Sequence, residues 1–249
     1  ILIDTEGIWH MGGVPIKPTD LINNIDMAWN TVSPELSVIL GSLAIPNIGQ
    51  KSFALENSKE LLQKHMKQIG VEMPRSIILP VYQEDFDGER ERYAIKKAKE
   101  VHEKFPAPWM VKSFNEDANM AIHLAKTFDE LVGAIEDGVK HGDSIVVEEF
   151  IAGKIASIHA VPEFRGENIY TFPLGNTFGN FSEEEKADLT SLSKTLHTHL
   201  GVEHYLKSDF VMNPRGRIYL LQIGTTPDLK PDSHCTQVCE SVGAKTHHV

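Results

Sequence analysis

Runs of apolar and polar residues change their spacing part-way along the chain, and the two halves predict different architectures. In the first half, residues 27–50 read as a short strand, a helix that begins at Ser33 and Pro34, and a second strand, which together make one βαβ unit. The next segment carries a single apolar helical stripe that Gly70 ends. Residues 76–82 then read as a buried strand.

The second half predicts antiparallel strands with helices segregated from them. Capping boxes that begin at Thr127 and Ser182 predict the starts of two helices. Residues 206–228 read as two strands joined by a turn at 213–216, and a helix follows near residues 232–242. The chain is therefore expected to be α/β, and α+β in its C-terminal part.

The same patterns suggest two domains. The polar, turn-rich stretch at residues 83–92 is the best linker candidate. We expect a partial N-terminal α/β domain over residues 1–80 and a second domain over residues 81–249. Within the second domain we expect a small subdomain, 81–143, and a larger antiparallel-sheet subdomain, 144–249.

Charge and composition narrow the classes of partner. The chain has 249 residues, with 24 basic against 35 acidic side chains and a net charge of -11, so it should be repelled by nucleic acids and anionic membranes. Its largest basic cluster, Lys96, Lys97 and Lys99, is expected to form a solvated helix face. Two cysteines and no secretory signal or spanning apolar run favour a reduced, cytoplasmic setting. The chain begins with Ile1 in a segment typical of a domain interior, which suggests a fragment.

Sequence motifs exclude several common kinds of site. The chain lacks the phosphate-loop, dinucleotide, serine-hydrolase and zinc-protease signatures. Twelve histidines suggest a metal site, but His197 and His199 lie two apart on a helix and point to different faces. A second candidate group comprises His234, Cys235, Cys239, His247 and His248. It lacks a paired C-x-x-C motif, so the favoured interpretation is a small apolar face with scattered surface imidazoles.

Lys112 is the most informative lysine. It lies in the apolar strand "WMVKSF", where a buried ammonium needs an anion such as a phosphate. Taken alone, a lysine that extends to solvent from a strand edge is an equally good interpretation.

In chain order, the segments "ENSKELLQK", "PWMVKSF", "VVEEFIAGK", "LKSDFVM", "GRIYLLQIGTTP" and "DSHC" resemble the ATP-grasp superfamily, and specifically the D-alanine–D-alanine ligase family. The resemblance implies an ATP-grasp fold that follows a partial βαβ domain. It also implies an ATP-dependent, Mg²⁺-dependent carboxylate–amine ligase that works through an acylphosphate in peptidoglycan biosynthesis. The implied substrate is an amino acid such as D-alanine, and the implied assembly is a homodimer.

The resemblance assigns nucleotide-binding roles by position. Lys59 and Lys112 match the family's two lysines on the phosphate side. Glu148 matches the acid that meets the adenine amino group, and the backbone of Glu149 and Ile151 would bind the purine edge.

Catalytic and metal roles follow in the same way. Lys207 stands where the family has an arginine beside the phosphates, and Ser233 falls near a serine that holds substrate carboxylate. Asp209 matches a magnesium ligand. Gln222 and Gly224 replace the family's bridging glutamate and asparagine, so the metal site is expected to be weakened.

Further departures leave two functions open. The loop at 115–119, "NEDAN", carries the acids Glu116 and Asp117 where the family has Gly and Ser, and Ile155 replaces an acid that binds ribose. The segment "GNTFGNF" is too short for the family's lid. These losses fit a divergent ligase, or a degenerate ATP-grasp module that binds nucleotide or a protein partner without catalysis.

Overall fold

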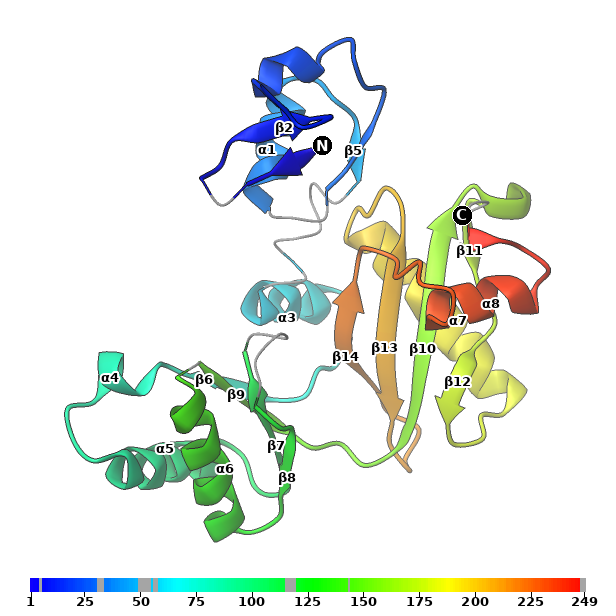
Figure 1. Cartoon of the computed structure of the whole chain (residues 1–249). Helices are drawn as coiled ribbons and strands as arrows, with labels where there is room; N and C mark the ends of the chain where they lie inside the picture. Colours follow the sequence, from blue (N-terminus) through cyan, green and yellow to red (C-terminus); the bar gives the residue numbers. More distant parts are fainter. Residues whose placement is uncertain are drawn as a thin grey trace. The chain divides into compact units, whose positions relative to one another are not determined.

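The computed structural model describes residues 1–4, 6–30, 34–48, 55, 58–114, 120–142 and 144–246. The chain forms two compact units (Figure 1). The first unit comprises Ile1–Val71, Lys154–Val211 and Leu220–Val249, and the second comprises Glu72–Gly153 and Met212–Tyr219. The predicted domain limits at residues 80 and 143 stay predictions.

The first unit begins with a small antiparallel sheet in the order β1-β2-β3, which the sequence patterns did not predict. Its strands are β1 (Leu2–Ile3), β2 (Trp9–Met11) and β3 (Val14–Ile16). The turn between β2 and β3 uses Gly12 and Gly13, both at positive φ, +59° and +82°, which glycine adopts without a Cβ clash. A 3₁₀ helix, η1 (Pro18–Leu21), follows.

The predicted βαβ unit is confirmed. Strands β4 (Ala28–Trp29) and β5 (Asn47–Ile48) are parallel, and α1 (Pro34–Ser42) connects them. The predicted cap, Ser33, lies outside the described residues. Helix α3 (Lys59–Gln68) buries Leu62 and Met66, and Gly70 follows its end with φ +70°, as expected for a C-terminal stop.

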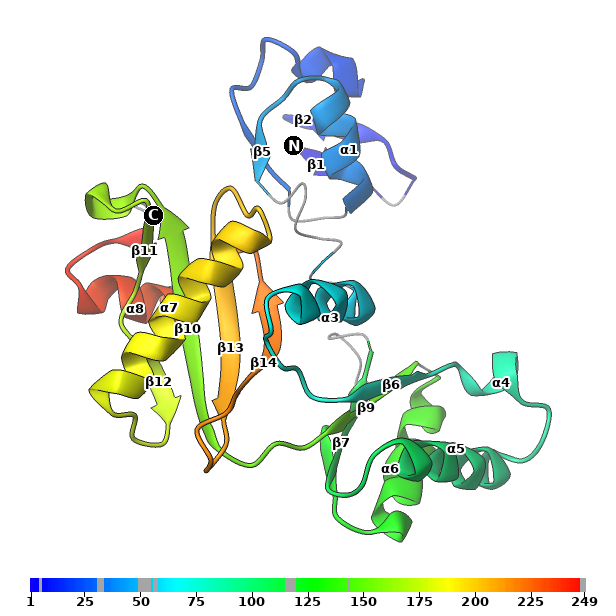
Figure 2. The same ribbon diagram turned by 180° about the vertical axis from the view of Figure 1, so that it is seen from behind.

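The rest of the first unit is a larger sheet with helices on both faces. Its strands run in the order β11-β10-β13-β14, and β12 also pairs with β10. The strands are β10 (Lys154–Pro162), β11 (Ile169–Thr171), β12 (Gly175–Phe178), β13 (Leu206–Met212) and β14 (Ile218–Gly224). Helix α7 (Glu183–His199) lies on one face and α8 (His234–Ser241) on the other, as the two opposite views show (Figures 1 and 2). A 3₁₀ turn, η2 (Phe164–Gly166), joins β10 to β11.

The second unit is a four-stranded antiparallel sheet in the order β6-β9-β7-β8. Its strands are β6 (Ser76–Leu79), β7 (Trp109–Ser113), β8 (His123–Ala125) and β9 (Ile145–Glu149). Its helices are α4 (Tyr82–Asp85), α5 (Arg90–Lys104) and α6 (Phe128–His141). Helices α5 and α6 lie side by side against the sheet (Figures 1 and 2), and the core includes Trp109, Val111 and Val147.

Local signals predicted most of these elements correctly. Both capping boxes form: the side chains of Thr127 and Ser182 accept from the backbone three residues on, and the partner glutamates close the motif. The hairpin of β13 and β14 turns at 213–216 as predicted, and α8 lies within the expected range.

Two expectations about exposure are wrong in part. Strand β6 is not buried throughout, since Ile78 is 48% exposed. Lys97 is not solvated: it is 7% exposed, its ammonium lies 3.1 Å from Glu100 Oε2, and it stands over the ring of Tyr93. Residues 83–92, the linker candidate, include the end of α4 and the start of α5, and their role as a linker stays a prediction.

Candidate functional site

In the second unit, Lys112 and Glu148 lie on the sheet face that is turned away from the core. In the antiparallel register of β7 and β9, Met110 is opposite Glu148 and Lys112 is opposite Val146. Side chains two apart on a strand share a face, so Lys112 and Glu148 are diagonal neighbours. Their charged atoms are 3.4 Å apart. The anion that Lys112 was expected to need is thus supplied, at least in part, by Glu148.

Glu149, the next residue on β9, points to the other face and binds Arg75. The guanidinium donates to both carboxylate oxygens, from Nε at 2.8 Å and from Nη2 at 2.9 Å. This pair lowers the pKa of Glu149 and raises that of Arg75. The backbone N–H of Glu149 also donates to the Arg75 carbonyl oxygen at 2.8 Å, so it takes part in the sheet.

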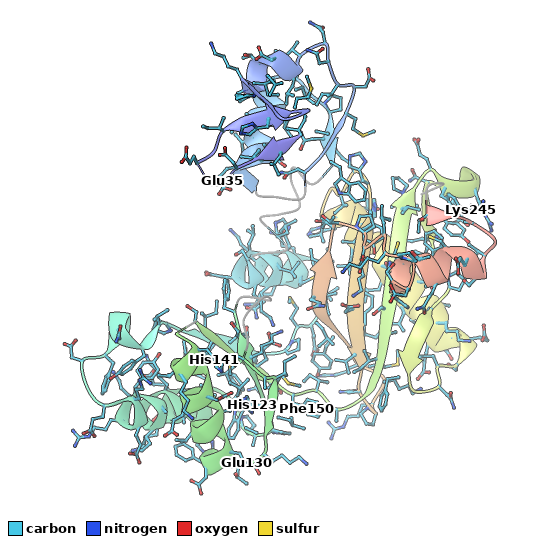
Figure 3. The ribbon with its side chains drawn as sticks, in the orientation of Figure 1. Glu35, His123, Glu130, His141, Phe150 and Lys245 are labelled. Carbon is cyan, nitrogen blue, oxygen red and sulfur yellow. The ribbon has the colours of Figure 1, made fainter. Side chains whose placement is uncertain are left out.

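The remaining nucleotide-binding candidates lie outside regular strands. Ile151 is half-buried in the segment after Phe150, which Figure 3 labels just beyond β9. Lys59 is the first residue of α3. Lys59 belongs to the first unit and Lys112 to the second, so their common role on phosphates stays a prediction. The acidic loop at 115–119 lies outside the described residues.

In the first unit, the side chain of Asp209 is held by donors from three strands. The hydroxyl of Ser157 on β10 donates to Oδ1 at 2.5 Å, and the amide nitrogen of Gln222 on β14 donates to Oδ2 at 2.8 Å. The ammonium of Lys207, two residues away on β13, lies 3.0 Å from the same Oδ2. Asp209 is 8% exposed. The structure thus brings together Lys207, Asp209 and Gln222, which sequence reasoning had placed at one site.

A chain of three ring groups, buried His159 and Tyr205 and half-buried His234, lies beside this carboxylate. His159, two residues after Ser157, is 2% exposed, with Nδ1 2.5 Å from the Tyr205 hydroxyl and Nε2 2.7 Å from His234 Nδ1. Burial lowers the pKa of His159 to about 3, with a further contribution from His234 and Lys207, so the ring is neutral near pH 7. Burial also raises the pKa of Tyr205, which keeps its hydroxyl protonated.

The low pKa of His159 predicts a loss of stability in mild acid. Unfolded imidazole takes up a proton below about pH 6.5, whereas the folded ring does so only near pH 3. The unfolded state therefore binds more protons in this window, and stability falls as the pH falls. Between pH 7 and pH 5 we expect His159 to account for about 2 kcal/mol of lost unfolding free energy.

Urea unfolding of the wild type and of His159→Gln at the two pH values measures this effect. The variant should lose about 2 kcal/mol less on acidification. His204→Gln, at an exposed position, is the matched control and should retain the wild-type difference. Equal pH dependence in wild type and His159→Gln would contradict the prediction.

The hydroxyl of Ser233 makes its hydrogen bonds within the chain. It is the N-cap of α8, where its hydroxyl accepts from the Thr236 N–H at 3.2 Å and donates to the Asp228 carbonyl at 2.5 Å. Its predicted contact with a substrate carboxylate stays a prediction.

The histidine and cysteine candidates that the structure describes do not converge on a metal. His197 Nε2 lies 2.9 Å from the His204 carbonyl oxygen, whereas the ring of His199 stands against that of His65. Cys235 and Cys239 are free thiols in an apolar cluster, as the favoured interpretation expected. His247 and His248 lie outside the described residues. Among the described residues, no group of three or more His, Cys, Asp or Glu side chains is placed to hold a metal ion.

Magnesium does not fit the described surroundings of Asp209. Mg²⁺ takes oxygen ligands in octahedral geometry, preferably with carboxylates. Here one carboxylate is present, and its oxygens already accept from a hydroxyl, an amide and an ammonium. For ATP, the chemical groups are suitable at Lys112 and Glu148: Lys112 is a cation of the kind that binds phosphate, and Glu148 is an acceptor of the kind that binds an amino group.

Sequence reasoning missed Ser157, His159 and Tyr205 as neighbours of Asp209. A weak signal existed, because Ser157 and His159 are polar residues two apart in the otherwise apolar strand "IASIHAV". Such an alternation marks a polar stripe, but only the register of three strands shows which carboxylate it meets.

Comparisons with solved structures define the class of fold. The structure of D-alanine–D-alanine ligase from Bacillus anthracis complexed with ATP matches with a TM-score of 0.66 at 18% identity, over 91% of this chain and 78% of that one. VanG D-Ala:D-Ser ligase from Enterococcus faecalis matches with a TM-score of 0.68 at 17% identity, over 88% of this chain and 69% of that one. The predicted ATP-grasp fold is confirmed.

Sequence comparisons give the particular relatives. D-alanine–D-alanine ligase from Paraburkholderia phymatum is 27% identical over 169 residues, covering 59% of this chain and 52% of the relative. The enzyme from Halalkalibacterium halodurans is 27% identical over 158 residues, covering 55% and 52%. No family model matches the chain. The resemblance to the D-alanine–D-alanine ligases is therefore confirmed, and the chain is a divergent relative that spans about half the length of the curated proteins it matches.

The described helices also bear on the expectation about membranes. None of them is both long enough and apolar enough to cross a bilayer.

Proposed function

We propose that this chain is part of an ATP-dependent carboxylate–amine ligase similar to D-alanine–D-alanine ligase. The observation that carries the proposal is the pair formed by Lys112 and Glu148 on the face of β7 and β9 that is turned away from the core, within an ATP-grasp fold. The ammonium is the kind of group that attracts a phosphate, and the carboxylate is the kind that accepts from an adenine amino group.

The other roles are those that the resemblance to the D-alanine–D-alanine ligase family implies. In the proposal, ATP supplies the phosphoryl group that activates one substrate carboxylate as an acylphosphate, and an amino acid such as D-alanine is the substrate. Lys59 and Lys207 neutralise phosphate charge, and the backbone of Glu149 and Ile151 borders the purine. Ser233 orients the substrate carboxylate. A homodimer that works in the cytoplasm, in peptidoglycan biosynthesis, completes the proposal.

Removing the Lys112 charge should weaken ATP binding. For Lys112→Met in the full-length protein we expect the dissociation constant for ATP to rise about tenfold, which corresponds to about 1.4 kcal/mol. Calorimetric titration measures it. Lys194→Met is the matched control, because it also removes a lysine that is paired with a glutamate, at 2.8 Å from Glu167, on α7. Unchanged affinity in Lys112→Met would contradict the nucleotide assignment.

One observation favours a second function, a nucleotide-binding or interaction module without catalysis. The donors around Asp209 leave the carboxylate paired and hydrogen-bonded within the chain, as a structural group would be. Release of phosphate from ATP separates the two functions: a D-alanine-dependent rise in phosphate supports the ligase, and ATP binding without such a rise supports the module.

A further inference from the structure

Asp209 and its partners form a charge-balanced group. The Lys207 ammonium carries one positive charge and the Asp209 carboxylate one negative charge, while Ser157 and Gln222 are neutral donors. Each oxygen of the carboxylate accepts at least one hydrogen bond, and Oδ2 has both Lys207 and Gln222 within 3.0 Å. A carboxylate at 8% exposure is thus compensated without any ion from solution.

The Gln222 amide donates its nitrogen to Asp209 and brings no negative charge to this group. A carboxylate offers only acceptors, so the amide must turn its nitrogen toward Asp209, which directs its oxygen elsewhere. Gln222 and Gly224 stand where the family has a glutamate and an asparagine, so these two positions offer a divalent ion no second carboxylate, and the positive charge beside Oδ2 comes from Lys207. The group is arranged as a lysine–carboxylate pair and not as one half of a metal site.

We propose that Lys207 is a built-in cation that takes the place of a divalent metal beside Asp209, so that anions bind to this face of the sheet without Mg²⁺. The side chain of Lys207 is 33% exposed, and an ammonium has three donors, so it reaches solvent while it pairs with Asp209. The identity of the anion as the phosphates of ATP rests on the proposed function. The replacement of metal by lysine rests on the contacts of Asp209 alone.

The role of Lys207 in place of a metal ion can be tested without any nucleotide, by asking whether an added metal ion restores the stability of a variant that lacks the lysine. Lys207→Met removes the cation and leaves Asp209 with two neutral donors, which we expect to lower the melting temperature by about 3 °C. Millimolar Mn²⁺, a probe for Mg²⁺ sites, should then raise the melting temperature of the variant by at least half of that loss, because an ion that binds only the folded state stabilises it. The wild type should shift by less than about 1 °C under the same conditions.

A matched control separates this effect from general ion binding. Lys154→Met removes another partly exposed lysine of the same sheet, whose ammonium lies 2.6 Å from Glu185 Oε2. It should lose stability without recovery in Mn²⁺. Lys207→Arg keeps the charge and should behave like the wild type.

Two results would overturn the inference. One is a wild-type protein that Mn²⁺ stabilises as much as it stabilises Lys207→Met, since the native site would then hold metal. The other is a Lys207→Met protein that Mn²⁺ does not stabilise. If Lys207→Met fails to fold, Lys207→Gln keeps a hydrogen-bond donor toward Asp209 while it removes the charge, and the same two outcomes decide.

A nucleotide titration then tests the consequence for binding. The dissociation constants for ATP in EDTA and in Mg²⁺ should agree within about twofold, or about 0.4 kcal/mol. A tenfold or greater requirement for Mg²⁺ would overturn the inference. A protein that binds no ATP in either condition would contradict the proposed function, and the metal-rescue experiment would still decide the role of Lys207.

Discussion

Replacement of Trp109 by alanine should lower the free energy of unfolding by about 3–5 kcal/mol. The indole is 1% exposed, lies in the core under α5 and α6, and donates its N–H to the Phe105 carbonyl oxygen at 3.0 Å. Truncation leaves both a cavity and an unpaired carbonyl at the end of α5. Because Trp109 begins β7, the loss also loosens the strand that presents Lys112.

Chemical denaturation of the two proteins measures the change. Trp29→Ala is the matched control, since the same truncation at a 43% exposed position on β4 should cost less than about 1 kcal/mol. A similar loss in both variants would mean that Trp109 does not hold the core of the second unit together.

Gly153→Ala should cost about 3 kcal/mol, from a steric cause. A Cβ at Gly153 would lie 2.1 Å from the Met212 carbonyl oxygen and 2.7 Å from its carbonyl carbon, so one backbone segment must move. Gly153 ends the segment that contains Ile151, a candidate for the purine edge. We therefore expect weaker ATP binding together with lower stability, measured by titration and by denaturation of the same variant.

A second glycine provides the control for this substitution. Gly133 lies in α6, and a Cβ added there would have no neighbouring atom within 4 Å, so Gly133→Ala should stabilise the protein by about 0.5–1 kcal/mol through helix propensity. Wild-type stability in Gly153→Ala would show that the two backbone segments separate at little cost.

Local signals predicted elements well because their causes are local. The caps at Thr127 and Ser182 act within one turn of helix, and the βαβ unit at 27–50 is formed by elements that follow one another directly along the chain. The burial of Lys97 was missed because it depends on packing: its alkyl chain lies in the interior while Glu100 pairs with its charge.

The candidate site shows the same division between local and distant causes. The family resemblance placed Lys207, Asp209 and Gln222 at one site, and they do lie together. It did not supply Ser157, whose hydroxyl reaches Asp209 only because β10 and β13 are neighbours in the sheet. Periodicity assigns a residue to one face of a strand, but the pairing of distant strands decides what that face meets.

The apolar cluster under α8 has a consequence for the chemistry of its two thiols. Burial raises the pKa of Cys235 and raises that of Cys239 to about 12, so both sulfurs remain protonated near neutral pH. Alkylating reagents and peroxides attack the thiolate, and both sulfurs are shielded by Phe172, Tyr205 and Val238. Covalent labelling of these cysteines would therefore proceed only as fast as the C-terminal helix lifts from the sheet.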